Sequence, residues 1–209
     1  MSYPLYAVYL LPSPALLYAL TQAHQVLAAT YNATAARRFA PHCTIKGFTK
    51  LAPGATPEAL IPALDAIFAH TPAFPTEIYP PWVSSSGSGG ESVLLWLKKS
   101  PAFLRLHAEV WNTLLPFIAH DCPFTPEEPA GPNFPPHITL VQYQLPGEPG
   151  LLAQGLELCR HIFETLPGRT FVARDLQLVE FQSADWEGAW WDTLRFRQIK
   201  GWRLTEASP

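Results

Sequence analysis

One short stretch occurs twice in the sequence, and it constrains the fold more than any other feature. The first copy is Pro41-His42-Cys43-Thr44-Ile45 and the second is Pro136-His137-Ile138-Thr139-Leu140, so the two histidines stand 95 positions apart. Each copy reads proline, histidine, any residue, threonine, aliphatic residue. If the chain folds as two related halves, the histidines can face each other across one cleft.

The segments around the two copies also repeat. An apolar, strand-like run precedes Ser13-Pro14 and another precedes Ser100-Pro101, and each Ser-Pro pair predicts an N-cap followed by proline at the first helical position. The next predicted helix starts are Pro57 and Pro149. The order strand, capped helix, His-x-Thr strand, helix, strand therefore occurs twice, which indicates a duplication. We expect one bilobal domain over 1–209, with an internal repeat of about 5–83 and 92–181 and C-terminal strands in 182–209.

Two loops and the last strands complete this outline. The stretch Ser84–Gly90 is rich in serine and glycine and predicts a flexible connection. The stretch Asp121–Pro136 is a long proline-rich loop that contains Glu127 and Glu128 and accounts for the extra residues before the second motif. Further strands are expected over about 170–181 and 189–199.

The bulk properties exclude some classes of protein. The 209-residue chain has a formal charge of −3, so it lacks the basic excess of a general nucleic-acid coat, although a small anionic ligand remains compatible. Its three cysteines, Cys43, Cys122 and Cys159, show no C-x-x-C spacing, which fits free thiols in a reducing compartment. No signal peptide and no apolar run of about 18 residues is evident. We expect a cytoplasmic monomer without a membrane span.

Alternation along a strand predicts which motif side chains share a face, because residues i and i+2 point the same way. A histidine and a threonine about 6.6 Å apart along a strand can then both touch one phosphate. One face is expected to carry His42, Thr44, Lys46 and Phe48 in the first copy, and His137, Thr139, Val141 and Tyr143 in the second. Cys43, Ile45, Ile138 and Leu140 are expected to point the other way, towards a helix layer.

Two imidazoles on opposite sides of a phosphodiester suit acid–base chemistry. A neutral imidazole can take the proton of the attacking oxygen while an imidazolium donates one to the leaving oxygen, since the unperturbed pKa is about 6.5. Each such group typically contributes about 10²–10⁴-fold, and threonine hydroxyls can stabilise the charge that builds on the non-bridging oxygens. Lys46, and Arg37 or Arg38, could neutralise the phosphate. No metal or other cofactor is expected, because two histidines without a carboxylate make a poor zinc or magnesium site.

The two motifs, His42-Cys43-Thr44-Ile45 and His137-Ile138-Thr139-Leu140, resemble the signature of the two-histidine (2H) phosphoesterase superfamily, which includes 2′-5′ RNA ligase-like enzymes and cyclic nucleotide phosphodiesterases. The resemblance implies a bilobal α+β fold with two antiparallel sheets flanking a central groove and helices outside. It also implies metal-independent hydrolysis of 2′,3′-cyclic phosphates, or action on 2′-5′ linkages, at nucleotide or RNA ends.

These observations lead to one main hypothesis about the site. The predicted catalytic residues are His42, Thr44, His137 and Thr139, and the predicted substrate-binding residues are Lys46, Arg38 and Tyr143. Tyr143 and Trp82 could stack a base. The sequence leaves open which histidine is acid and which is base, whether the product is a 2′- or a 3′-phosphate, and whether hydrolysis or ligation is favoured.

Plainer interpretations compete with this hypothesis. Lys46 could be a solvated strand residue, Arg37 and Arg38 surface charges, and Tyr143 and Phe48 packing residues. The histidines without a repeated context are taken as structural or surface residues: His24, His70, His107, His120 and His161. A Cys43 nucleophile is disfavoured by alternation. At the level of function, the alternatives are an RNA-end or nucleotide-binding module with little turnover, and a phosphodiesterase for another small cyclic phosphate.

Overall fold

A computed structural model of the protein describes residues 3–85, 90–122 and 131–206. Helices and antiparallel strands alternate along the chain, so the predicted α+β class is confirmed. The strands are β1 (Leu5–Leu11), β2 (Cys43–Thr49), β3 (Phe74–Ser85), β4 (Glu91–Leu97), β5 (His137–Leu145), β6 (Thr170–Ala173), β7 (Asp175–Gln182) and β8 (Arg195–Arg203). The helices are α1 (Pro14–Tyr31), α2 (Pro57–Phe68), α3 (Pro101–Leu114) and α4 (Pro149–Glu164), with short 3₁₀ turns η1 (Ala36–Arg38), η2 (Leu115–Phe117), η3 (Gly131–Asn133) and η4 (Trp190–Asp192).

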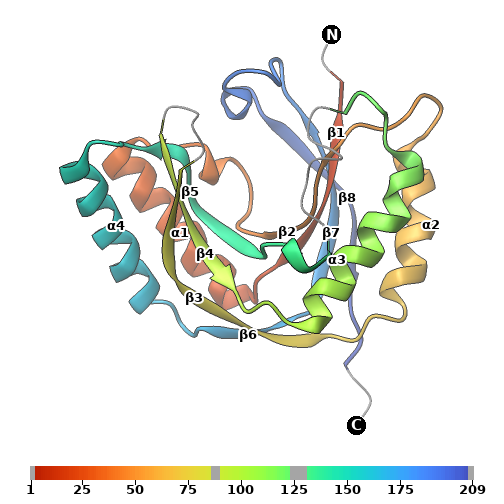
Figure 1. Cartoon of the computed structure of the whole chain (residues 1–209), viewed down its shortest axis with the longest axis horizontal. Coiled ribbons are helices and arrows are strands. Elements are labelled where there is room, and N and C mark those ends of the chain that lie inside the picture. The colour runs from red at the N-terminus through yellow and green to blue at the C-terminus, as the bar shows by residue number, and fades with distance from the viewer. Residues whose placement is uncertain (1–2, 86–89, 123–130, 207–209) are drawn as a thin grey trace.

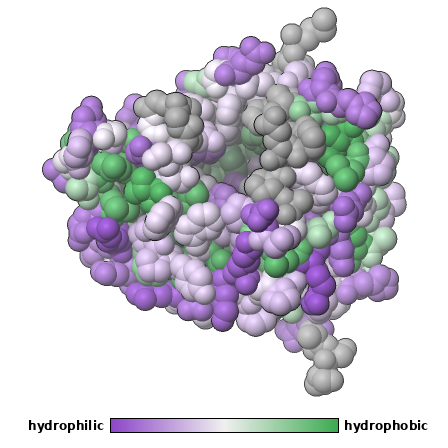
Figure 2. Space-filling view, viewed as in Figure 1, coloured by the Kyte–Doolittle hydropathy of each residue, from purple (hydrophilic) through white to green (hydrophobic). Residues whose placement is uncertain are grey.

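The strands form one curled antiparallel sheet made of two four-stranded halves. The strand order is β6-β3-β4-β5-β2-β1-β7-β8, and the halves meet where the two motif strands pair at Cys43 and Ile138. We call β2-β1-β7-β8 lobe A and β5-β4-β3-β6 lobe B. The helices lie on the outer side of the curl, α2 and α3 with lobe A and α1 and α4 with lobe B (Figure 1). The inner side of the curl is hollowed into a groove (Figure 2). The motif strands are therefore the two innermost strands.

The lobes do not coincide with the two halves of the sequence. The third strand of the first half, β3, pairs with β4 in lobe B, whereas β7 from the second half pairs with β1 in lobe A. The helices cross over as well, since α1 packs on β5 and α3 packs on β2. Each motif strand thus rests on a helix that comes from the other half of the chain.

This crossing explains a correction to the predicted strands. The stretch expected as one strand over about 170–181 is divided at Arg174 into β6 and β7, because β6 pairs with β3 in lobe B and β7 pairs with β1 in lobe A. The strand expected over 189–199 is instead the turn η4 followed by β8. Residues 86–89 of the predicted flexible connection lie outside the described residues. So do residues 123–130 of the proline-rich loop, which include Glu127 and Glu128.

In lobe A the sheet is apolar on both sides. Val8, Leu10 and Ile45 belong to the main core between the sheet and the helices. A second, mainly aromatic cluster occupies the groove side of lobe A and includes Tyr9 and Phe181. Aromatic side chains from the turn before β8 close this second cluster, so the groove of lobe A is filled close to the motif strands.

Candidate active site

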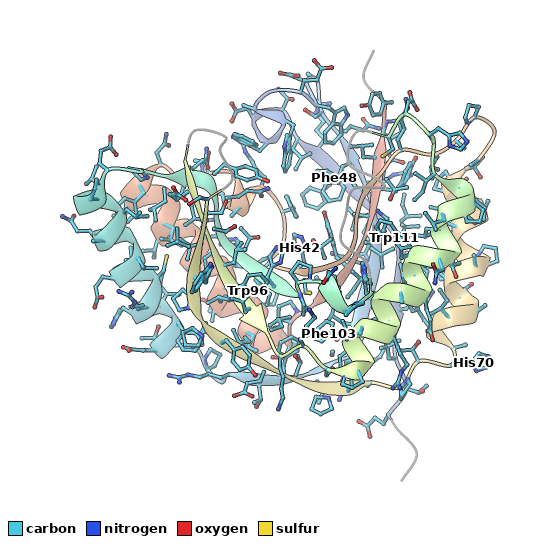
Figure 3. All side chains as sticks on the ribbon, in the orientation of Figure 1. His42, Phe48, His70, Trp96, Phe103 and Trp111 are labelled. Carbon is cyan, nitrogen blue, oxygen red and sulfur yellow. The ribbon has the colours of Figure 1, made fainter. Side chains whose placement is uncertain are left out.

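A pocket lies where the two motif strands meet, on the groove side of the sheet. It encloses about 150 Å³. The molecular surface is hollowed between the lobes (Figure 2), and His42 lies at the centre with Phe48 on one side and Trp96 on the other (Figure 3). The lining brings together all four predicted catalytic residues with side chains from α1, η1 and η4: Tyr9, His24, Ala36, Phe39, Ala40, Pro41, His42, Thr44, Gly47, Phe48, His137, Thr139, Gln142 and Trp190.

Both motif histidines are held in the same way by their own backbone. Nδ1–H of His42 donates to the carbonyl of Ala40 over 2.9 Å, and Nδ1–H of His137 donates to the carbonyl of Pro135 over 2.7 Å. A carbonyl can only accept, so the hydrogen of each neutral ring lies on Nδ1 and the lone pair lies on Nε2. The intervening proline of each motif has a fixed φ, which presents the preceding carbonyl to the ring.

The two rings have different neighbours. His42 packs against Tyr9 with the ring centroids 3.7 Å apart and an angle of 30° between the planes, and the Phe39 centroid lies 4.9 Å from His42. His137 meets Trp96 edge to face, with centroids 5.8 Å apart. Two aromatic faces therefore fix the orientation of His42, whereas one edge contact supports His137.

Burial favours the neutral form of both imidazoles. Loss of solvation lowers the pKa of His42 from 6.5 to about 3, although its hydrogen bond to Ala40 opposes the shift and the charges of His137 and His24 add to it. Burial also lowers the pKa of His137, against the hydrogen bond to Pro135. At neutral pH each Nε2 therefore offers a lone pair.

A bulge in each motif strand limits the predicted alternation. In β2, Thr44 pairs with Tyr9 and Lys46 pairs with Val8, so Ile45 has no partner of its own in β1. In β5, Thr139 pairs with Leu94 and Val141 pairs with Val93, so Leu140 has no partner of its own in β4. The next residue in each strand is thereby turned to the helix side. Alternation was predicted correctly up to each threonine and fails after it.

The predicted face of Lys46 is therefore wrong. Its side chain is fully buried on the helix side, and Nζ lies 4.8 Å from the centroid of the Trp111 ring of α3. Lys46 does not line the pocket, so the geometric reason for assigning it to a phosphate is lost.

Tyr143 does not line the pocket either. The bulge places Gln142 in the pocket lining, and Tyr143 adopts a positive φ of 56° and packs near Trp191, with ring centroids 5.9 Å apart. Gln142 was missed because nothing in its local sequence marks the bulge.

The other predicted substrate residues lie outside the pocket lining. Arg38 is exposed on η1 and lies 3.8 Å from the carboxylate of Asp192, while Arg37 donates to Gln25. Trp82 is 61% exposed on β3, and its cross-strand neighbour is Leu94, which pairs with Thr139. Trp82 therefore shares the groove face, two strands away from the motif.

His24 is the main residue that the sequence interpretation missed. It was assigned to structure or surface, but it is only 3% exposed, lines the pocket, and donates Nε2–H to the carbonyl of Thr139 over 2.9 Å. Tyr9, Phe39 and Trp190 were also missed as lining residues. They reach the pocket through tertiary packing between distant segments, which no local pattern predicts.

Cys43 lies on the helix side, as alternation predicted. It is 1% exposed within the main core, and burial raises the pKa of its thiol to about 12. A thiolate at this position would be strongly disfavoured at neutral pH.

The arrangement defines a class of protein. Two His-x-Thr motifs that meet from the inner strands of a bilobal α+β sheet are the mark of the two-histidine (2H) phosphoesterases. The chain belongs to the 2′-5′ RNA ligase superfamily, whose family model matches residues 12–185. This membership points to a phosphoesterase or RNA ligase-like activity.

Solved structures share the fold at low sequence identity. The protein TT0787 of Thermus thermophilus is 12% identical with a TM-score of 0.60, covering 98% of this chain and 100% of that chain. E. coli LigT complexed with 3′-AMP is 18% identical with a TM-score of 0.53, over 98% of this chain and 100% of that chain. A third structure, of a phosphoesterase, is 15% identical with a TM-score of 0.52 and the same coverage. None of the curated protein sequences matches the chain. None of the helices described in the structure is long and apolar enough to cross a membrane.

Proposed function

We propose that the protein is a metal-independent phosphoesterase that opens 2′,3′-cyclic phosphates, or acts on 2′-5′ linkages, at nucleotide or RNA ends. The observation that carries this proposal is the matched pair of imidazoles. Each is fixed by Nδ1 to its own backbone, each leaves Nε2 for chemistry, and both line one pocket with Thr44 and Thr139.

In hydrolysis, one Nε2 takes a proton from water as the water oxygen bonds to phosphorus. The bond from phosphorus to the 2′ or 3′ oxygen breaks, and the second imidazolium gives its proton to that leaving oxygen. Repulsion between two charged imidazoles disfavours a second proton on the pair, so one ring is neutral while the other is charged. One ring therefore acts as the base and the other as the acid, with the hydroxyls of Thr44 and Thr139 donating to the non-bridging oxygens.

The pocket has to compensate the negative charge of a bound phosphate. Among the described residues that line it, the basic side chains are three histidines. An anion in the pocket favours an imidazolium, so substrate binding should draw a proton onto the pair. Sulfate, which does not titrate near neutral pH, should show this as proton uptake by calorimetry in buffers of different ionisation enthalpy.

One observation favours a second candidate, a nucleotide- or RNA-end-binding module with little turnover. Burial lowers the pKa of both motif histidines, so the imidazolium needed for turnover is scarce at neutral pH before an anion binds. The two candidates differ in whether a bound anion restores the imidazolium. A module of this kind retains its ligand without forming product.

The test is turnover of the four nucleoside 2′,3′-cyclic phosphates, and of an oligonucleotide ending in one, in EDTA. The wild type is compared with His42→Ala and His137→Ala, and His70→Ala, an exposed histidine after α2, serves as the matched control. Loss of turnover in both motif variants supports the proposal. Turnover that EDTA abolishes, or that survives in both variants, refutes the mechanism. Binding without product by a folded wild type supports the second candidate.

A further inference from the structure

Two buried histidines outside the motifs hold the motif strands at their bulges. Nε2–H of His24 on α1 donates to the carbonyl of Thr139 over 2.9 Å, and His107 Nδ1 on α3 lies 2.6 Å from the carbonyl of Ile45. Each histidine follows the first strand of one half of the chain and bonds to the motif strand of the other half. A bulge disrupts the ladder locally and leaves backbone groups that need other partners, and the histidines supply the hydrogen.

The two histidines differ in their relation to the pocket. His24 lines it beside both motif histidines. His107 does not line it; its ring is fully buried and stacked on Phe134, with centroids 3.9 Å apart and an angle of 4° between the planes. His107 thus serves as a natural comparison, because it is a buried helix histidine that bonds to a motif strand without lining the pocket.

We propose that His24 is a positioning residue of the phosphate site. It acts through Thr139, to which it is bonded, and through His137, which lies two residues earlier on the same strand. This inference rests on the proposed function. The hydrogen bond fixes the peptide plane that follows Thr139, at the point where the bulge lets the strand shift. The position of the threonine hydroxyl relative to both imidazoles depends on that plane.

A small displacement at this point should have a large effect. Misplacing a reacting or stabilising group by about 1 Å can reduce turnover by about 10²-fold. Without the imidazole, the Thr139 carbonyl is left without this buried donor, and water or a strand shift has to satisfy it. We expect a larger effect on kcat than on the affinity for phosphate, because the hydroxyl donates to the bound phosphate and contributes most when charge builds on it.

The structure also gives a spectroscopic signature for this role. His24 carries its hydrogen on Nε2, whereas His42 and His137 carry theirs on Nδ1. Nitrogen-15 correlation spectra of the imidazoles distinguish the two tautomers. A His24 ring that is protonated on Nδ1 at neutral pH overturns the assignment.

The variants are chosen by the reach of the donor. His24→Gln keeps an amide nitrogen close to the position of Nε2, His24→Leu removes the donor, and His24→Asn keeps a donor that is too short to reach Thr139. His107→Leu is the matched control. We expect His24→Leu and His24→Asn to lose about tenfold to 10²-fold in kcat for a 2′,3′-cyclic phosphate. His24→Gln should recover to within about threefold of the wild type, and His107→Leu should lose thermal stability with a smaller change in kcat.

The outcomes separate this inference from the proposed function. Inorganic phosphate binding is measured on every variant, so the comparison does not depend on turnover. If the wild type turns over no cyclic phosphate, the proposed function fails, whereas a phosphate Kd about tenfold weaker in His24→Leu and near normal in His24→Gln still supports the role of His24. A folded His24→Leu or His24→Asn with the wild-type kcat and phosphate Kd overturns it, and so does a Gln variant as impaired as the Leu variant.

Discussion

Acid should lower the free energy of unfolding through His42, and the size of this decrease follows from the burial of the His42 imidazole in the pocket. Burial holds the pKa of His42 at about 3, whereas the same imidazole in the unfolded chain titrates near 6.5. Between these pH values the unfolded chain binds a proton that the folded chain excludes, so the free energy of unfolding falls as the pH falls. At about pH 4.5, roughly two units below the unfolded pKa, the loss is about 2.7 kcal/mol. Because His42 is only half-buried, solvent screening reduces this to about 1–2 kcal/mol.

The assay is urea unfolding of the wild type, His42→Asn and His70→Asn at about pH 7 and about pH 4.5. Protonation of carboxylates with lowered pKa values, such as Asp65 beside Lys200 and Asp121 beside Lys50, also lowers the free energy of unfolding in acid. Their effect is common to the three proteins and cancels in the comparison. The wild type and His70→Asn should lose about 1–2 kcal/mol more than His42→Asn on acidification.

Equal losses in the wild type and His42→Asn would refute the argument that the pocket excludes a proton from His42. A further check uses the anion. Sulfate should restore part of the stability of the wild type at about pH 4.5, because it favours the imidazolium in the pocket and binds only the folded state. It should restore less in His42→Asn.

Two further predictions concern the helix cap and the buried lysine. The Ser100 hydroxyl accepts a hydrogen bond from the N–H of Phe103 over 3.2 Å, whereas Ser13 makes no such bond. In chemical denaturation, Ser100→Ala should therefore lower the free energy of unfolding by about 1 kcal/mol and Ser13→Ala should lower it by less. Equal losses would contradict the capping argument. Because Lys46 lies outside the pocket, a folded Lys46→Met variant should keep its turnover within about threefold of the wild type. A loss of more than about 10²-fold, the size expected for a group that acts on the phosphate, would show that Lys46 belongs to the site.

The sequence was sufficient to predict that the histidines and threonines of the two motifs come together, because each motif is local and alternation holds from His42 to Thr44. It failed two residues later, because the bulge at Ile45 turns Lys46 to the helix side. The isolated Gly47 within this strand is the one local signal that could have indicated a bulge. The same local argument misplaced Lys46, and it counted Tyr143 as a substrate residue although Tyr143 does not line the pocket. The class of fold followed from the order of elements along the chain.

His24 was out of reach of the sequence for a different reason. Its contact with Thr139 spans 115 positions and depends on α1 crossing to the other lobe. A pattern of strands and helices gives their order but not which helix covers which strand. Residues that reach a site through such packing can be found only once the packing is known.

The exchange of strands between the lobes has a consequence for how the protein folds. Lobe A needs β7 beside β1, a pairing that brings Tyr6 and Glu180 together across 174 positions of sequence. Contacts this distant fold slowly, because the entropy of closing the loop is lost before the pairing stabilises it. On the ribosome, β1 can pair with β2 early, but lobe A stays incomplete until β7 has emerged as far as residue 182. The pocket should therefore be among the last features to assemble, and recovery of its chemistry during refolding should report completion of the whole fold.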